Sequence, residues 1–246
     1  MRKVDERAVN DGVKKILDIY ERNVSDDFEF YLRKDGYHHE FVKINGKEYP
    51  VFYWRNVSAL CGMQGKAARS IGDRSHMKCS VYEGKDVSVY ELFFREAEIC
   101  EWFFESEISH VFALKNGNTV NAVLDHKCGG ISTLELAAVM PEECTPQGKR
   151  KMFASHGFVS DQPIGHKLAP EAVYLFRNGK NPETFSDGSV DLYGLNLDEL
   201  AAVSSVYYML VGADDKEDIL KRYLKLTELT DRVRKKLESG IAEVNV

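Results

Sequence analysis

Three charged residues recur at helical spacing near the middle of the chain, and they are the first group that could do chemistry. Glu91, Arg95 and Glu98 lie four and three residues apart, so a helix places them on one face. There the Arg95 guanidinium could bind a polar ligand through two parallel hydrogen bonds. The same spacing fits an ion-pair ladder on an exposed helix face, which stabilises a protein only modestly. Both interpretations stay open.

Histidine supplies one further candidate among the seven histidines of the chain. His156 precedes Gly157 in a loop predicted between two short strands, where it could line a cleft and bind a ligand. His38 and His39 are neighbours in a predicted strand. Their side chains then point to opposite faces and cannot hold one metal ion together. We predict no metal site.

The sequence lacks the motifs of known catalytic and cofactor sites. There is no Gly-x-Ser-x-Gly, no His-Glu-x-x-His and no cysteine in a nucleophile signature. Gly65-Lys66 has the look of a P-loop, but Leu60 stands where such a loop needs its first glycine. Ala67 also replaces the Ser or Thr that would bind magnesium. The sequence therefore identifies no catalytic residue and no cofactor-binding residue.

Composition narrows the class of protein. A chain of 246 residues with 43% hydrophobic and 29% charged residues can bury a substantial core and has no bias typical of disorder. The net charge of −6, with only short basic clusters, argues against nucleic acid or an anionic membrane as partner. Five cysteines without a CxxC pair indicate reduced thiols. No apolar run is long enough to span a membrane, and we expect a cytoplasmic protein.

A helix followed by a β-meander is predicted at the start of the chain. Apolar residues recur at helical spacing from Asp5 to about Asn23. Strands are expected at 28–32, 39–44 and 49–54, joined by Asp-Gly and Asn-Gly turns, which are the strongest local hairpin signal. We predict that residues 1–55 form an accessory layer.

A largely antiparallel sheet with flanking helices is predicted for the remainder. Strands are expected at 109–115, 121–127, 130–139, 149–156, 158–161 and 173–177. Because little helix separates them, neighbouring strands should run antiparallel. Helices are expected at 87–104, at 197–210 and at 216–239. We predict one α+β domain over residues 1–246.

Short phrases in the second part of the chain resemble a known family. A helix with a Trp near its end leads to Val111-Phe112-Ala113, then to a Gly turn and the strand 131–135. A glycine-bounded element follows at 153–159, and residues 236–244 form a last helix and short strand. From Glu91 onward, this order of features resembles the C-terminal domain of the Gfo/Idh/MocA oxidoreductases. The resemblance implies an open, mainly antiparallel sheet with helices packed on one face.

Departures from the family pattern concern its chemistry. Members begin with a Rossmann domain that holds the nicotinamide dinucleotide, and this chain shows neither its GxGxxG turn nor the family's Glu-Lys-Pro tripeptide. The family's Asp and His on the helix facing the nicotinamide would fall on Glu91 and Arg95. An arginine stays charged near neutral pH and cannot shuttle a proton. If this alignment holds, the chain alone transfers no hydride.

The leading functional hypothesis is a non-catalytic or accessory Gfo/Idh/MocA C-terminal-like domain without its Rossmann domain. The family commonly uses the free sheet face for oligomer contacts, so we expect a homo-oligomer or pairing with a Rossmann-containing subunit. A sugar-like or other polar small molecule is the expected ligand. No cofactor is expected on this chain itself.

Two alternatives leave open whether the chain is part of an enzyme. It could be the substrate-binding part of an NAD(P)-dependent oxidoreductase, in which NAD or NADP binds through a Rossmann domain that is on another chain or missing from this one. It could also be an unrelated α+β enzyme that uses Glu91, Glu98 or His156 as acid and base.

Overall fold

The computed structural model describes residues 4–22, 24, 26–141, 147–161, 172–177, 183–186 and 195–246, with the backbone alone at 58, 68–70, 172–177 and 183–186. The chain falls into two compact units. The sheet unit comprises residues 59–186 and 226–246, and the meander unit comprises residues 2–58 and 187–225. That residues 1–246 act as one domain, with 1–55 as an accessory layer, stays a prediction.

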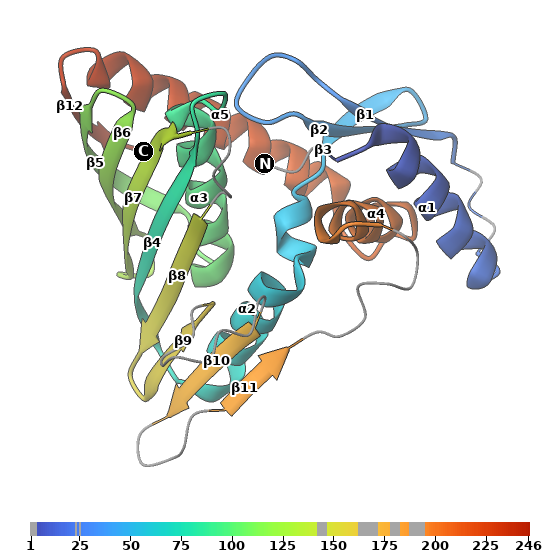
Figure 1. Cartoon of the computed structure of the whole chain (residues 1–246), viewed down its shortest axis with the longest axis horizontal. Helices are drawn as coiled ribbons and strands as arrows, with labels where there is room; N and C mark the ends of the chain where they lie inside the picture. The colour runs from blue at the N-terminus through green and yellow to red at the C-terminus, as the bar shows by residue number, and fades with distance from the viewer. Residues whose placement is uncertain are drawn as a thin grey trace. The chain divides into compact units, whose positions relative to one another are not determined.

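Within the described residues of the sheet unit, nine strands form one large sheet in the order β11-β10-β9-β8-β4-β7-β6-β5-β12 (Figure 1). The strands are β4 (Arg74–Gly84), β5 (Ile108–Asn116), β6 (Thr119–His126), β7 (Ile131–Met140), β8 (Gln147–Ala154), β9 (Gly157–Ser160), β10 (Ala172–Arg177), β11 (Glu183–Ser186) and β12 (Ile241–Asn245). Strands β4 and β7 are parallel, and the other described neighbours are antiparallel. The predicted mainly antiparallel sheet is confirmed, with one parallel pair at its centre.

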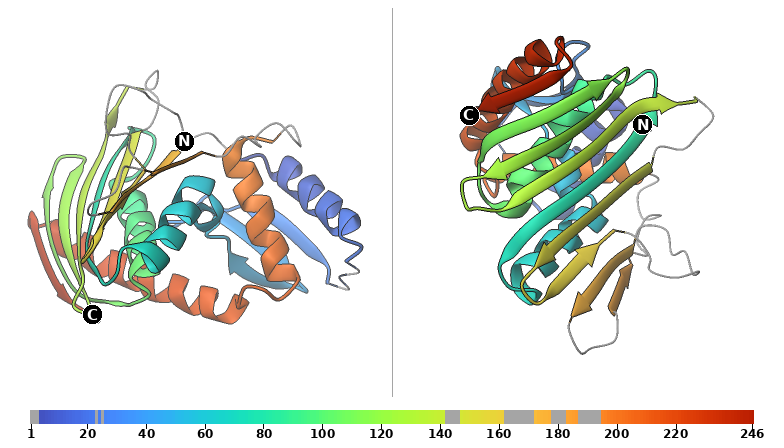
Figure 2. Two further views of the ribbon diagram at one scale, coloured as in Figure 1. Left: turned by 90° about the horizontal axis from the view of Figure 1, so that it is seen from below. Right: turned by 90° about the vertical axis from the view of Figure 1, so that its left-hand side faces the viewer.

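Helix α3 (Val89–Phe104) packs on the middle of the large sheet. Ser88 caps its first turn by accepting a hydrogen bond from the Tyr90 N–H (3.2 Å), and the helix ends at Glu105 in the left-handed region. The helix contacts β4, β6 and β7. In the right-hand view of Figure 2 the strands of the large sheet lie in front of α3, which confirms the predicted packing of a helix on one face.

The alternation of side chains gives the large sheet two different faces. On β6, Leu124 is fully buried and Val123 is exposed, because successive side chains of a strand point to opposite sides. We call the side that packs against α3 the covered face and the other side the open face. Side chains of the covered face include Met77, Cys79, Val81, Val111, Leu124, Leu134, Leu136 and Val244.

Two further helices flank the strands of the sheet unit. Helix α2 (Ser58–Ser70) precedes β4 in the chain. Helix α5 (Lys216–Leu237) gives residues 226–237 to the sheet unit and its first ten residues to the meander unit. Arg232 and Lys236 of α5 donate hydrogen bonds to the carbonyls of Asn245 and Glu243 in β12. These bonds blunt the edge of the sheet against further strand pairing.

The meander unit is built on three antiparallel strands in the order β1-β2-β3. Its elements are α1 (Glu6–Ile19), β1 (Phe28–Leu32), β2 (Glu40–Ile44), β3 (Lys47–Pro50), a short 3-10 helix η1 (Tyr53–Asn56) and α4 (Leu197–Leu210). The predicted meander is confirmed, although its third strand ends early and residues 53–56 turn into η1. A capping box between Asn196 and Glu199 starts α4.

The core of the meander unit holds a buried histidine within an aromatic cluster. The His38 ring lies 5.5, 5.3, 5.1 and 6.3 Å from the rings of Phe41, Phe52, Trp54 and Tyr223. Burial lowers the pKa of His38 to about 3. The imidazole is therefore neutral at physiological pH and packs as an aromatic side chain.

Among the described helices of the chain, none is long and apolar enough to cross a membrane.

Candidate functional site

Arg95, the central residue of the sequence-predicted cluster, is held by two carboxylates under the covered face. Its Nη1 lies 2.9 Å from Oε1 of Glu83 on β4, and its Nε donates to Oε1 of Glu96 at 3.0 Å. The Arg95 side chain is 15% exposed and the Glu83 side chain 5%. Arg95 is thus oriented by ion pairs inside the sheet unit.

Glu96 also pairs with Arg150, which lies on β8. Arg150 donates to both oxygens of the fully buried Glu96 carboxylate, from Nε at 2.8 Å and from Nη2 at 2.6 Å. Asp161, just after β9, accepts from the Arg150 backbone N–H at 2.6 Å and lies 3.6 Å from its Nη1. Five alternating charges result, in the order Glu83, Arg95, Glu96, Arg150 and Asp161. We call them the ionic chain.

Glu96 and Arg150 stay charged because of their neighbours in the ionic chain. Burial raises the pKa of Glu96, but Arg150 and Arg95 outweigh it and the net pKa lies below its ordinary value. Burial also lowers the pKa of Arg150, and Glu96 reverses this and raises it overall. Burial raises the pKa of Asp161. Glu96 and Arg150 can therefore orient groups by fixed charge, but they do not exchange protons near neutral pH.

The other two members of the predicted cluster occupy different environments on α3. Glu98 is fully buried. Glu91, in the first turn, is half-buried and lines a polar cavity of about 360 Å³ together with Ser88 and Lys115. The helical spacing is as predicted, but the three side chains do not form one solvent-facing surface. Their role as ligand-binding residues stays a prediction.

His156 lies far along the same hairpin from the ionic chain. It is exposed in the turn between β8 and β9, and its N–H donates to the carbonyl of Ile71 at 2.9 Å. Gly72, with φ of +78°, leaves room for it, because a Cβ there would meet His156 Cδ2 at 2.9 Å. Arg150 is six residues earlier, about 15–20 Å along an extended strand. The structure therefore does not bring His156 together with Arg95.

Four residues of the ionic chain were not predicted from the sequence. Glu83 and Glu96 fall in no motif, and Asp161 is the last residue of a predicted short strand. Arg150 lies in the strand predicted at 149–156, which begins at Gln147 in the structure. One signal was available. Arg150 stands between Lys149 and Lys151, and in a strand it must point to the face opposite to both.

The open face carries a shallow depression of about 430 Å³ over β4 to β7. Its lining side chains are His76, Lys78, Phe112, Leu114, Asn121, Val123, Thr133 and Glu135. His76 Nε2 lies 3.1 Å from Thr133 Oγ1, and Ser80 donates to Glu135 at 3.0 Å. The depression therefore joins polar groups of β4 and β7 to apolar groups of β5 and β6.

Exposed apolar side chains gather on the open face of four neighbouring strands. Phe112 pairs with Val123 across β5 and β6, and Leu114 pairs with Ile241 across β5 and β12. These four, with Ile131 of β7, are between 37% and 55% exposed. We call these five residues the apolar strip. They are large side chains left in water on one side of a sheet.

Charges of opposite sign flank the apolar strip. Lys149 and Lys151 of β8 pair in register with Ser80 and Lys78 of β4, so three lysines lie on the β8 side of the open face. On the β12 side, Glu243 pairs with Phe112 and lies 3.5 Å from His110. The open face is thus basic toward one edge, apolar in the middle and acidic toward the other.

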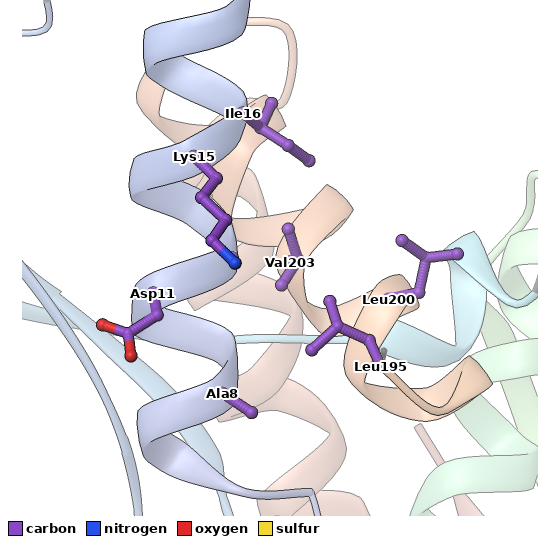
Figure 3. Close-up of a pocket in the computed structure, with 8 residues that line it drawn as sticks. Ala8, Asp11, Lys15, Ile16, Leu195, Leu200 and Val203 are labelled. Carbon is purple, nitrogen blue, oxygen red and sulfur yellow. The ribbon is translucent and has the colours of Figure 1, made fainter. Parts of the chain in front are cut away.

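A smaller groove lies in the meander unit between α1 and α4 (Figure 3). It measures about 170 Å³, with Asp11 and Lys15 of α1 on one side and Leu195, Leu200 and Val203 on the other. Most of the lining is aliphatic, and the groove carries no set of groups suited to catalysis. Across the described residues of both units, no cluster of three or more His, Cys, Asp or Glu side chains could hold a metal ion.

Comparisons place this architecture among solved oxidoreductases, although no protein-family model and no curated protein sequence matches the chain. An inositol dehydrogenase homologue from Azotobacter vinelandii, solved with NADH and myo-inositol, superposes with a TM-score of 0.62 at 12% identity, over 80% of this chain and 64% of that one. An oxidoreductase from Agrobacterium radiobacter, solved with NAD+, L-tartaric acid and magnesium, gives 0.60 at 11%, over 78% and 63%.

A probable dehydrogenase from Thermotoga maritima gives a TM-score of 0.55 at 12% identity, over 79% of this chain and 63% of that one. The chain thus spans less than two thirds of the length of each of these proteins. At such low identity the likeness is one of fold. The resemblance predicted from the sequence is confirmed at that level, and the chain shares its fold with a large part of the inositol dehydrogenase homologues.

Proposed function

We propose that the chain is a non-catalytic assembly domain, in which the open face of the large sheet packs against the open face of a second copy. The observation that carries this proposal is the apolar strip, whose five side chains are 37% to 55% exposed. Several large apolar side chains exposed on one sheet face are typical of interaction sites. Fully burying one such side chain contributes about 1.5–3 kcal/mol, so covering the strip would favour association.

The charges beside the strip favour a second copy as the partner. A two-fold axis parallel to the strands, between β6 and β7, would lay β8 of one copy over β12 of the other, given the strand order. Lys149 and Lys151 would then face the partner copy's acidic edge around Glu243. Such an interface is self-complementary, as two-fold symmetry requires. Complementary charges also fix the register of two packed surfaces.

The test is the mass of the purified chain in solution, measured by size-exclusion chromatography with light scattering. The wild-type chain should be a dimer, and Phe112→Glu should shift it to the monomer, because a carboxylate would be buried in the interface. Leu224→Glu is the matched control, since Leu224 is 58% exposed but belongs to the meander unit. A monomeric wild-type chain at micromolar concentration would overturn the proposal, as would equal effects of both substitutions.

A second candidate function is the substrate-binding part of an NAD(P)-dependent oxidoreductase whose Rossmann domain is on another chain or missing from this one. The fold likeness to a protein solved with NADH and myo-inositol favours it. In this version a sugar-like polar ligand binds near Glu91 and Arg95, and NAD or NADP is held by the partner domain. The fixed charge of Arg95 would orient hydroxyl or carboxylate groups, while the proton and hydride steps belong to the partner.

Titration calorimetry with NAD(H), NADP(H) and myo-inositol separates the two candidates. A dimer that binds none of them supports the assembly domain. Binding of myo-inositol that Arg95→Met abolishes, without dinucleotide binding, supports the substrate-binding part. Co-purification of a dinucleotide-binding subunit points the same way. Micromolar dinucleotide binding by the purified chain would contradict the expectation that this chain holds no cofactor.

A further inference from the structure

Two buried cysteines face each other between the central strand and the helix that covers it. The Sγ atoms of Cys79 on β4 and Cys100 on α3 are 3.9 Å apart, and neither residue is exposed. The other two described cysteines, Cys61 and Cys128, are exposed. The buried pair therefore differs from the two exposed cysteines in its burial and in the short distance between its sulfur atoms. Neither the assembly domain nor the substrate-binding reading makes use of it.

The cysteine pair lies beside the ionic chain. Cys79 is the register partner of Arg150 across β4 and β8. On α3, Cys100 follows Glu96 by four residues, so both project from one side of the helix. The sulfur contact and the Glu96–Arg150 ion pair thus both connect α3 to the large sheet at the same level.

The environment keeps the Cys79 thiol protonated in the resting protein. The hydrogen bond with Cys100 and burial raise the pKa of the Cys79 thiol well above its usual range. Because the thiolate is the reactive form, attack by an oxidant is slow and needs a local opening of α3.

We propose that Cys79 and Cys100 are a latent disulfide that a peroxide closes, locking α3 onto β4. In the first step one thiol releases its proton and the thiolate attacks one peroxide oxygen, which gives a sulfenic acid and hydroxide, and the hydroxide takes up the released proton to become water. In the second step the other thiol attacks the sulfenic sulfur and releases a second water molecule. Overall, two thiols and one hydrogen peroxide give one disulfide and two water molecules. The cysteine sulfurs are oxidised and the peroxide is reduced.

Closure requires a short movement and has a local consequence. The sulfurs must approach from 3.9 Å to about 2.05 Å, which side-chain rotation and a small shift of α3 supply. Because Glu96 lies one turn away from Cys100, the shift acts on its ion pair with Arg150 and so on the position of Arg95. The disulfide would also close the loop 79–100, which restricts the unfolded chain and stabilises the folded one.

The experiment uses the whole chain with Cys61, Cys128 and Cys144 replaced by serine, so that only the buried pair remains. The protein is treated with hydrogen peroxide, unfolded, and alkylated. The oxidised protein should lose both alkylation sites, have a mass lower by two hydrogens, and yield one cross-linked peptide pair that contains Cys79 and Cys100. A further Cys100→Ser substitution in the same background is the matched control and should leave Cys79 alkylatable or singly oxidised.

Peptide mapping of the peroxide-treated wild-type chain gives a second test that does not depend on the serine background. The same cross-link should appear there, and its urea midpoint should rise and return to the starting value after dithiothreitol. Free thiols at both positions after prolonged oxidation would overturn the proposal. So would sulfonic acids at both positions, or disulfides that join Cys79 or Cys100 only to other cysteines.

Discussion

The two faces of the large sheet distribute charge in opposite ways. The covered face buries the five alternating charges of the ionic chain, while the open face leaves the apolar strip in water and places its lysines and glutamate around it. A single protein molecule usually does the reverse. The covered face therefore holds one arrangement of α3 on the sheet by paired charges, and the open face has properties suited to contact with another surface. Residue type alone does not tell which face a side chain belongs to.

The largest effect is expected from breaking the ionic chain. Glu96→Leu would leave Arg95 with Glu83 alone and Arg150 with Asp161 alone under the covered face, and it would remove the two hydrogen bonds that Arg150 donates to Glu96. Removing one partner of a buried ion pair costs about 3–5 kcal/mol, and the free energy of unfolding measured in urea should fall by that amount.

Two variants test whether the loss comes from the broken ion pair. Glu96→Leu with Arg150→Met removes both partners of that pair and should recover part of the lost stability, because Asp161 keeps the hydrogen bond from the backbone N–H of residue 150. Lys151→Met, at the next position but on the open face, should change the free energy of unfolding by less than about 0.5 kcal/mol. If Glu96→Leu and Lys151→Met lower the free energy of unfolding by the same amount, charges on the covered face matter no more for stability than charges on the open face.

Neighbouring apolar residues of β6 give the next contrast. Leu124→Ala on the covered face should cost about 2–5 kcal/mol, because a fully buried side chain leaves a cavity. Val123→Ala on the open face, where the side chain is 37% exposed, should cost less than about 1 kcal/mol. Urea unfolding at a concentration that keeps the chain monomeric measures both. A larger loss for Val123→Ala would mean that the open face is covered within the chain.

The histidine of the covered face, His126, should contribute to the pH dependence of stability. Burial lowers the pKa of His126, whose Nε2 lies 2.8 Å from Ser132 Oγ. The folded protein therefore favours the neutral ring. This contribution is complete above the unfolded pKa of about 6.5 and is lost as the pH falls toward the folded pKa, by at most about 1.4 kcal/mol per pH unit.

The urea midpoint should accordingly fall between pH 7 and pH 5, and His126→Gln should reduce the slope. His110→Gln on the open face is the control. The pKa of His38 is lowered to about 3, so His38 also lowers the urea midpoint as the pH falls. Both variants retain His38 and therefore keep this contribution. If the urea midpoint of His126→Gln depends on pH as strongly as that of the wild type, His126 does not cause the pH dependence.

Much of the fold could be predicted from the sequence because local signals agree with the final structure. Helices α3, α4 and α5 begin and end within a few residues of the predicted bounds. The Asn116-Gly117-Asn118 turn needs a positive φ at Gly117, which is +57°, and such turns reveal hairpins before any tertiary contact is known. The family resemblance, based on short phrases from Glu91 onward, predicted the packing of helices on one face.

Strand β4 was not predicted, and with it most of the candidate site was missed. Its buried residues Met77, Cys79 and Val81 alternate with His76 and Lys78, which is the pattern of a half-buried strand, and this signal was missed. Its parallel pairing with β7 is a contact over more than fifty residues, which no local pattern encodes. The ionic chain joins α3 to β4, β8 and the end of β9. Its members therefore become neighbours only in the folded chain.

The smallest effect on folding, and the sharpest test of the open face, is expected from its charges. Lys151→Glu should change the free energy of unfolding by less than about 0.5 kcal/mol, since the side chain is partly exposed and lies on the open face. In the proposed two-fold packing the same substitution sets like charges of two copies against each other near Glu243. The dissociation constant of the dimer, measured by analytical ultracentrifugation, should therefore rise.

Combining Lys151→Glu with Glu243→Lys restores opposite charges across the interface and should restore association, an effect that weakens as salt is added. If the reversed pair associates no better than Lys151→Glu alone, β8 does not lie over β12, and the open face meets its partner in another register.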